Sequence, residues 1–183
     1  MPPRLDLGAY SRLALVTFST DPSKNSLGVQ ATHQFAEDLL ASQTGFELLE
    51  LGPADSLVAR LLADGNAPEA AKQVGREKDV AAVFFGELVV SGTKASGSVN
   101  AGGNLSVSGT VSAELHVRLL STSSGGTAWR SSATTSRNVG QVSMSGGKLP
   151  SISATDPNAA YAKMVDDLVT QVTRDARPTW VKQ

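Results

Sequence analysis

The chain has 183 residues, of which 40% are hydrophobic and 18% are charged, and this length and composition fit one domain with an ordinary core. Its formal net charge is -1, and Lys and Arg are scattered without interleaved aromatic residues, which argues against nucleic acid as a partner. The absence of cysteine excludes disulfides, thiolate metal sites and a cysteine nucleophile. No run of about 18 apolar residues is present, so we predict no transmembrane helix.

The first half of the chain alternates patterns typical of strands with patterns typical of helices. Short apolar runs bounded by turn residues indicate strands, and apolar residues at four-residue spacing indicate helices, the first of which has Ser26 as its expected cap. Strands are predicted over 12–19, 46–51 and 80–90, and helices over 26–42, 54–63 and 68–78. Because helices separate these three strands, we expect the strands to be parallel or mixed neighbours.

The stretch from Val80 to Arg137 organises the rest of the chain. A buried strand over 80–90 leads into a Gly/Ser-rich run over 91–110, and two strands follow over 111–120 and 127–137. From Val99 to Leu119 every odd position is apolar or small and every even position is polar or glycine. Strict alternation of this kind predicts a strand with one buried or apolar face and one solvent-exposed face. A flexible linker or a disordered loop has no reason to keep that register.

A last helix is predicted from Ala159 to about Asp175, which completes the order β-α-β-α-α-β-β-β-α. The later strands are joined by turns, so we expect them to be antiparallel. The fold class is therefore α/β in the α+β sense, with helices packed on a single mixed β-sheet and a long β-hairpin extension. We predict one α/β domain over 1–183, with insertions at about 91–110 and 135–155.

Five segments, taken together in this order, resemble the family of the curli secretion channel lipoprotein. They cover 10–18, 35–50, 74–86, 115–129 and 175–181. The wider group includes the α/β domain at the amino terminus of the Tol-system propeller protein and the lipoprotein activators of penicillin-binding proteins. The resemblance implies an envelope lipoprotein-type domain, although the lipidated cysteine of that family is absent from this chain.

Residues with catalytic potential do not converge in the sequence. Two Ser-x-x-Lys motifs occur, at 91–94 and 145–148, but both lie in strand-like sequence where positions i and i+3 point to opposite faces. His33 and His116 have no carboxylate at ligand spacing, which favours structural or solvated roles over a metal site. Without a nucleophile, a base and an oxyanion site together, the sequence predicts no enzyme, no cofactor and no metal.

The two insertions carry the functional hypothesis. In the curli channel family the corresponding insertions are amphipathic hairpins, and copies from many subunits close an outer-membrane barrel. Such a barrel is expected to have a band of large apolar side chains and aromatic girdles. Here Gly, Ala and Ser dominate, which favours a water-soluble hairpin extension that packs against itself or a neighbouring subunit. The candidate interaction residues are Val99, Leu105, Val107, Val111, Val142 and Met144.

The resemblance, together with the absence of a convergent catalytic group, thus implies a non-enzymatic bacterial cell-envelope domain, derived from a lipoprotein, that acts in envelope assembly or secretion. Its partners would be other envelope proteins or further copies of itself, held by the hairpins and by strand addition at the sheet edge. The alternative is an oligomeric outer-membrane secretion pore subunit of the curli-channel kind. We expect a periplasmic, outer-membrane-associated location with the signal segment removed. Membrane contact would come through a lipid anchor absent from this chain or through the hairpins. An enzyme or small-ligand binder would need a pocket of convergent polar groups lined by Asp21, His33 or Lys94.

Overall fold

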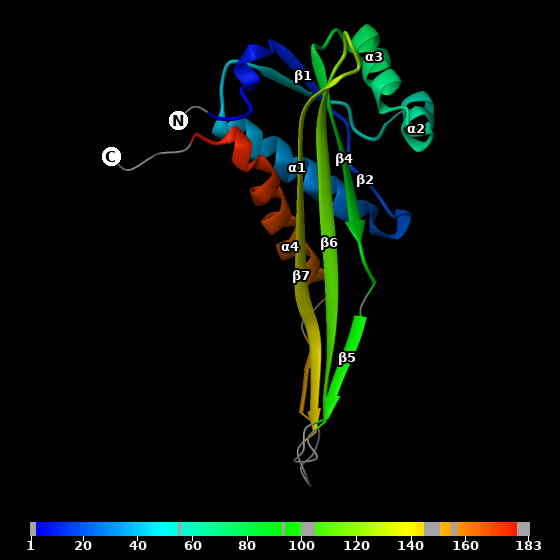
Figure 1. The fold of residues 1–183 in the computed structure, drawn as a ribbon, viewed down its shortest axis with the longest axis vertical. Coiled ribbons are helices and arrows are strands. Elements are labelled where there is room, and N and C mark those ends of the chain that lie inside the picture. Colours follow the sequence, from blue (N-terminus) through cyan, green and yellow to red (C-terminus); the bar gives the residue numbers. More distant parts are fainter. Residues whose placement is uncertain are drawn as a thin grey trace, which may run out of the picture.

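The structure is a computed structural model that describes residues 3–54, 56–92, 94–99, 105–144, 151–154 and 157–178. Its strands are β1 (Arg12–Leu15), β2 (Ser19–Thr20), β3 (Glu47–Glu50), β4 (Ala82–Val90), β5 (Lys94–Val99), β6 (Leu105–Ser121), β7 (Thr127–Met144) and β8 (Ser151–Ala154). Its helices are α1 (Asn25–Ser42), α2 (Ser56–Ala63), α3 (Ala67–Lys78) and α4 (Pro157–Val172). Within the described residues the strands form one sheet in the order β3-β1-β4-β6-β7-β8, with β2 beside β4 and β5 beside β6 (Figure 1).

The strand directions confirm the predicted mixed α+β sheet. β1 pairs in parallel with β3 and β4, and β2 pairs in parallel with β4. The pairs β4–β6, β5–β6, β6–β7 and β7–β8 are all antiparallel. Helical crossovers therefore join the parallel strands of the first half, and a described turn over 122–126 joins the antiparallel strands β6 and β7.

The strand predicted over 12–19 is broken into β1 and β2. At the break the backbone N–H of Phe18 leaves the ladder and donates to Thr32 Oγ1 at 2.9 Å, and Thr32 Oγ1 donates in turn to the carbonyl of Gly28 at 2.7 Å. Helix α1 lies so close here that a Cβ on Gly28 would be 2.7 Å from the Phe18 carbonyl oxygen. The break is therefore stabilised by the helix, because a buried N–H needs a partner.

The expected cap at Ser26 is wrong, because the chain is already turning before that residue. A 3-10 turn over Pro22–Lys24 runs directly into α1, which begins at Asn25. Asp21 caps this turn by accepting the backbone N–H of Ser23 at 2.9 Å. A short polar residue before Pro is the usual opening of such a turn.

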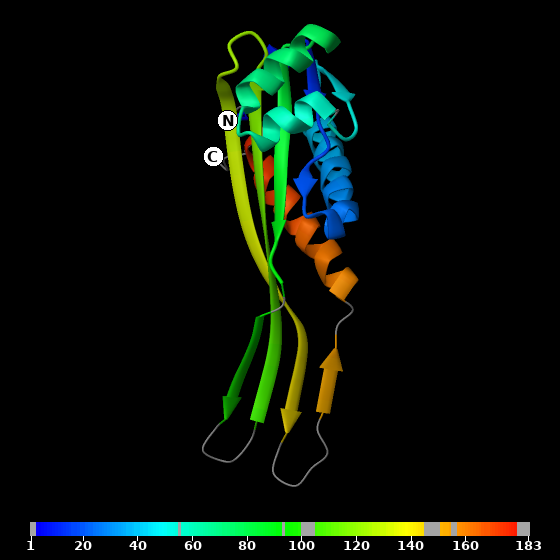
Figure 2. The ribbon, with the colours of Figure 1, turned by 90° about the vertical axis from the view of Figure 1, so that its right-hand side faces the viewer.

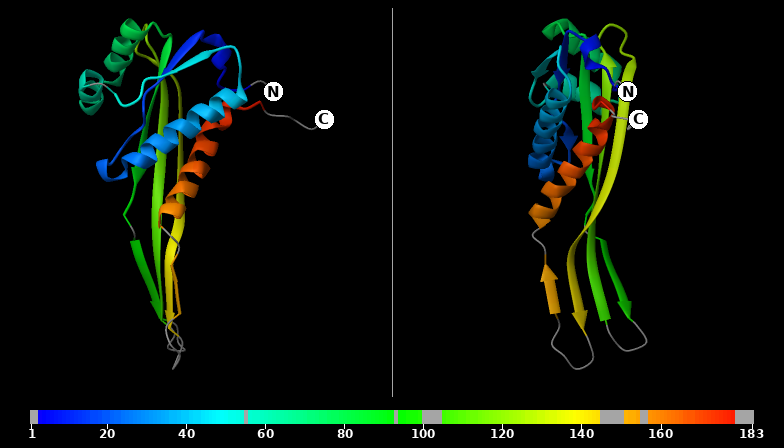
Figure 3. Two further views of the ribbon diagram at one scale, coloured as in Figure 1. Left: turned by 180° about the vertical axis from the view of Figure 1, so that it is seen from behind. Right: turned by 90° about the vertical axis from the view of Figure 1, so that its left-hand side faces the viewer.

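Helices cover the two faces of the sheet unequally. Figure 3 shows α1 and α4 crossing one face together. There the ring centroid of Phe35 of α1 lies 5.3 Å from that of Phe18 in a tilted contact and 5.2 Å from that of Phe84 of β4 in an edge-on contact. On the opposite face α2 and α3 cover one end, where they bury Val83, Phe85 and neighbouring apolar side chains. The helices of the described residues leave the remaining part of that face uncovered.

The two longest strands, β6 and β7, run past the helical body. They contain 17 and 18 residues, and in Figure 2 their far halves lie between β5 and β8 as four strands side by side. This four-strand part, called the extension below, comprises β5, residues 105–110 of β6, residues 138–144 of β7, and β8. The predicted long hairpin extension is therefore confirmed, with β5 and β8 as strands that the sequence patterns did not mark separately.

Candidate functional site

The alternation predicted for β6 continues from the body into the extension. In the body, Val111, Ala113 and Leu115 are buried in the core under α4 and α1. Val107 lies on the same face of β6, four residues before Val111 and within the extension. Val107 is 36% exposed, whereas Val111 is 1% exposed. The apolar face of β6 thus passes from a covered region into one where no described helix lies over it.

The strand β7 contains a β-bulge at Val139, which shifts its pairing with β6 by one residue. Thr110 pairs with Asn138, but Gly109 pairs with Gly140, which leaves Val139 as the extra residue. The Asn138 side chain accepts the backbone N–H of Gly140 at 3.0 Å across the bulge. Since an extra residue changes which positions share a face, odd positions of β7 face α4 in the body and even positions occupy that face in the extension.

The register divides the extension into two chemically distinct faces. Opposed residues of neighbouring strands lie on the same face of a sheet. The small-apolar face holds Ala95, Gly97, Val99, Leu105, Val107, Gly109, Gly140, Val142, Met144, Ile152 and Ala154. The hydroxyl face holds Lys94, Ser96, Ser98, Ser106, Ser108, Thr110, Gln141, Ser143, Ser151 and Ser153. On this second face the Ser96 and Ser108 hydroxyls are hydrogen-bonded at 2.9 Å.

Both outer strands of the extension have an open edge within the described residues. β5 pairs only with β6, and β8 pairs only with β7. Successive strands alternate in direction, so β5 and β8 point in opposite directions, as the arrows in Figure 2 show. The β8 edge of one copy is therefore oriented to accept the β5 edge of another as a further antiparallel strand.

The candidate interaction residues are brought together by this register. Leu105 opposes Val99 on one side and Met144 on the other, and Val107 opposes Val142. The sixth residue, Val111, lies at the start of the covered region, where it belongs to the core. The five others are positions of the small-apolar face.

The catalytic candidates are not assembled into a reactive group. The hydroxyl of Ser91 is hydrogen-bonded to the Ser112 hydroxyl at 2.6 Å, which ties the end of β4 to the middle of β6. The motif at 145–148 lies outside the described residues. His33 lies 3.5 Å from Glu50, and His116 lies 3.2 Å from Glu114. In the part of the chain that the structure describes, no group of three His, Asp or Glu side chains is arranged to hold a metal ion.

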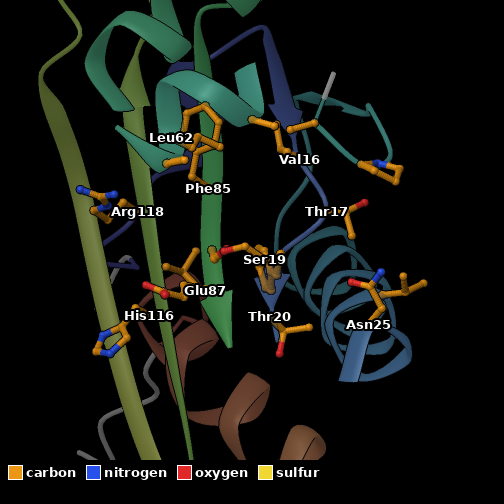
Figure 4. A pocket seen from close by; sticks show the side chains of 18 of the residues that line it. Val16, Thr17, Ser19, Thr20, Asn25, Leu62, Phe85, Glu87, His116 and Arg118 are labelled. Atoms are coloured by element: carbon orange, nitrogen blue, oxygen red, sulfur yellow. The ribbon is translucent and has the colours of Figure 1, made fainter. Parts of the chain in front are cut away.

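A cleft of about 1020 Å³ opens on the sheet face that α2 and α3 leave uncovered. Figure 4 shows Leu62 beside Phe85 at one end of the labelled lining, with Glu87, His116 and Arg118 along the sheet and Thr17, Ser19, Thr20 and Asn25 across from them. Arg130 of β7 also lines it. Sequence reasoning placed His116 and Arg118 on a polar strand face but did not find this cleft, because its other walls come from distant segments.

A smaller hollow of about 320 Å³ lies beside α1 and includes His33, Glu50, Thr17 and Thr32. Of the two pockets described for the structured part of the chain, it is the one lined by a residue named for the enzyme alternative, His33. The Thr32 hydroxyl, however, already accepts the Phe18 N–H and donates to the Gly28 carbonyl. Among the described residues, no hydrogen bond joins His33 to a hydroxyl. The hollow therefore lacks an activated nucleophile.

No helix in the described part of the chain is both long enough and apolar enough to cross a membrane.

Comparisons with known proteins match structures and not sequences. No family model matches the chain, and no curated protein matches it significantly. Solved structures that it resembles include the PelC dodecamer from Paraburkholderia phytofirmans, at 14% identity and a TM-score of 0.49, over 98% of this chain and 94% of that one. Another is the lipoprotein GNA1162 from Neisseria meningitidis, at 15% identity and a TM-score of 0.39, over 88% and 96%. A third is the LpoB C-terminal domain from Salmonella enterica, at 13% identity and a TM-score of 0.35, over 68% and 82%.

Proposed function

We propose that this chain is a non-enzymatic protein-interaction domain of the bacterial cell envelope, which acts in envelope assembly or secretion through its extension. The observation that supports this function is the extension itself, in which four strands present one small-apolar face and two open edges. The envelope location rests on the sequence segments that resemble the curli channel lipoprotein family.

Strand addition is the mode of binding that this geometry favours. Backbone hydrogen bonds along an open edge supply affinity, and the alternating side chains supply register and specificity. Monomeric proteins usually protect such edges with Pro or charged residues. β8 has neither, and β5 has only Lys94, at its end. A second copy of the chain is the partner that we favour, because its β5 edge matches the β8 edge in direction and in face.

The test is the oligomeric state in solution, measured by sedimentation velocity for three proteins. The unmodified chain should form an assembly. Val107→Lys places a charge on the small-apolar face and should shift the protein to the monomer, because an assembly that covers this face must desolvate the charge. Ser108→Lys is the matched control, since the same charge then lies one residue away on the hydroxyl face.

Equal assembly of both lysine variants would contradict a role for the small-apolar face. A monomeric unmodified chain across the accessible concentration range would exclude self-association as the mode of action. The proposal would then require a different protein as the partner of the edges.

The alternative function is the oligomeric outer-membrane secretion pore subunit of the curli-channel kind. Its supporting observation is that the extension has two amphipathic hairpins and that copies joined β5 to β8 would form an uninterrupted antiparallel sheet. This alternative requires a large ring in detergent and ion conductance across a lipid bilayer. An interaction domain should instead stay soluble and conduct nothing, so planar-bilayer recordings distinguish the two.

A further inference from the structure

The open cleft of the body has a feature that the extension does not explain. Arg118 of β6 and Arg130 of β7 are direct cross-strand partners, and both line the cleft. Like charges directly opposite each other on a sheet destabilise it. Among the residues that the structure describes, neither guanidinium has an ion-pair or hydrogen-bond partner.

The nearby acidic side chains do not neutralise this pair. Glu114 lies 3.2 Å from His116 and is four residues from Arg118 along β6, on the same face of the sheet. Glu87 opposes His116 rather than either arginine, and none of the ion pairs of the described residues includes Glu87. The two guanidinium groups are therefore available to a ligand. The side chains of Glu87, Glu114 and His116 lie on the same face beside them.

The wall next to the arginines is apolar. Phe85 of β4 opposes Arg118 directly, and Figure 4 shows Leu62 of α2 close to Phe85 above Arg118. Phe85 is 5% exposed and belongs to the core cluster under α2 and α3. The cleft thus combines a paired cationic wall with an apolar end, which matches a molecule that carries both an anionic and an apolar group.

We propose that this cleft binds an organic oxyanion, a phosphate or carboxylate group that bridges Arg118 and Arg130 while an attached apolar group packs toward Phe85 and Leu62. The planar guanidinium fork suits both kinds of oxyanion, because each presents two oxygens that accept parallel hydrogen bonds. A bound anion also removes the repulsion between the two opposed charges. The site is on the opposite face of the sheet from the small-apolar face and is independent of the proposed assembly.

The experiment measures binding of phenyl phosphate, benzoate and inorganic phosphate to the full chain by NMR at low ionic strength. We expect phenyl phosphate to bind more tightly than inorganic phosphate, because only the former has a group for the apolar end. The double variant Arg118→Gln/Arg130→Gln should weaken phenyl phosphate binding at least about tenfold, since hydrogen bonds to charged groups are the strong ones. Arg174→Gln, which changes an exposed arginine outside the cleft, is the control and should leave binding unchanged.

Benzoate distinguishes the source of the oxyanion. Binding of both aromatic probes identifies the shared oxyanion chemistry, and binding of phenyl phosphate alone identifies a phosphate ligand. Unchanged affinity in the double variant, or an equal loss in Arg174→Gln, overturns the proposal. A thermal melt without ligand gives a second readout: the double variant should melt no lower than the unmodified chain. A lower melting temperature with unchanged binding would show that the arginines are purely structural.

Discussion

Gly86 controls how closely the segment between β1 and β2 approaches the sheet. A Cβ added at Gly86 would lie 2.3 Å from Cδ1 and 2.6 Å from Cγ of Phe18. Phe18 is 2% exposed, and its ring centroid lies 5.3 Å from that of Phe35. It therefore has no free space into which to withdraw, and Gly86→Ala must move either the ring or β4.

The expected cost of Gly86→Ala follows from these contacts. Overpacking of a filled core costs about 1–3 kcal/mol, and removal of a glycine from a strand interior returns about 0.5–1 kcal/mol. The middle of the two ranges gives a net loss in the free energy of unfolding of about 1 kcal/mol, which corresponds to a fall in Tm of about 2–4 °C for a chain of this size. Urea unfolding and a thermal melt measure both quantities.

A double-mutant cycle identifies the cause. Phe18→Leu removes the ring that the new methyl group meets, so the two substitutions together should cost at least about 0.5 kcal/mol less than the sum of their separate costs. Gly92→Ala is the control, because a Cβ there meets no atom within 4 Å. Additive costs, or an equal effect of Gly92→Ala and Gly86→Ala, would refute the steric argument.

Three further predictions concern the body, the extension and the response to acid. Thr32→Val should cost about 1–3 kcal/mol in urea unfolding because it removes the acceptor of the buried Phe18 N–H, and Thr32→Ser should cost clearly less. Deletion of Val139 should preserve the pairing of Gly109 with Gly140 in interstrand NMR contacts, whereas deletion of Gln141 should disrupt the small-apolar face and the assembly. The Ser23 hydroxyl and backbone N–H hold the pKa of Asp21 below its usual value. A lowered pKa gives stability that is present above about pH 4 and is lost as the pH falls through the folded-state pKa. Ser23→Ala should therefore raise that pKa in an NMR titration, and an unchanged titration would exclude the hydrogen bond as its cause.

A strand could be predicted along its full length only where its polar and apolar residues alternate without a break. The alternation of β6 is complete, and from Val107 to Leu119 the sequence placed its polar and apolar faces correctly. In β7 the bulge at Val139 shifts the pattern by one residue, so the predicted strand ended at Arg137 although the real strand continues to Met144. The segment Asn138–Gly140 was the available signal for this bulge. An Asn side chain can hydrogen-bond the backbone two residues further on, and glycine is common at bulges.

The cleft was beyond sequence reasoning for a different reason. Whether Arg118 meets Arg130 depends on the register of β6 and β7. The connecting turn and a bulge at Ala128 set that register together, because Leu120 pairs with Thr127 whereas Leu119 pairs with Trp129. Here the Ser121 carbonyl accepts the Gly125 N–H at 2.8 Å, and the Ser121 N–H donates to the Gly126 carbonyl at 2.9 Å. Gly125 has a φ of +72°, a conformation that favours glycine. The residue types Ser124-Gly125-Gly126 indicated a turn, but they left open which arginine would lie opposite Arg118.

The strand β6 explains how one sheet serves two unrelated surfaces. Its odd positions form the core of the body and continue as the small-apolar face of the extension, whereas its even positions line the cleft with His116 and Arg118. Val107 and Arg118 therefore lie on opposite faces and share no contact. A change at either position acts on one surface alone, because effects at separated positions without shared partners are additive. Any coupling between assembly and anion binding would have to pass through a shift of β6 itself, and the buried residues between the two positions, from Val111 to Val117, oppose such a shift.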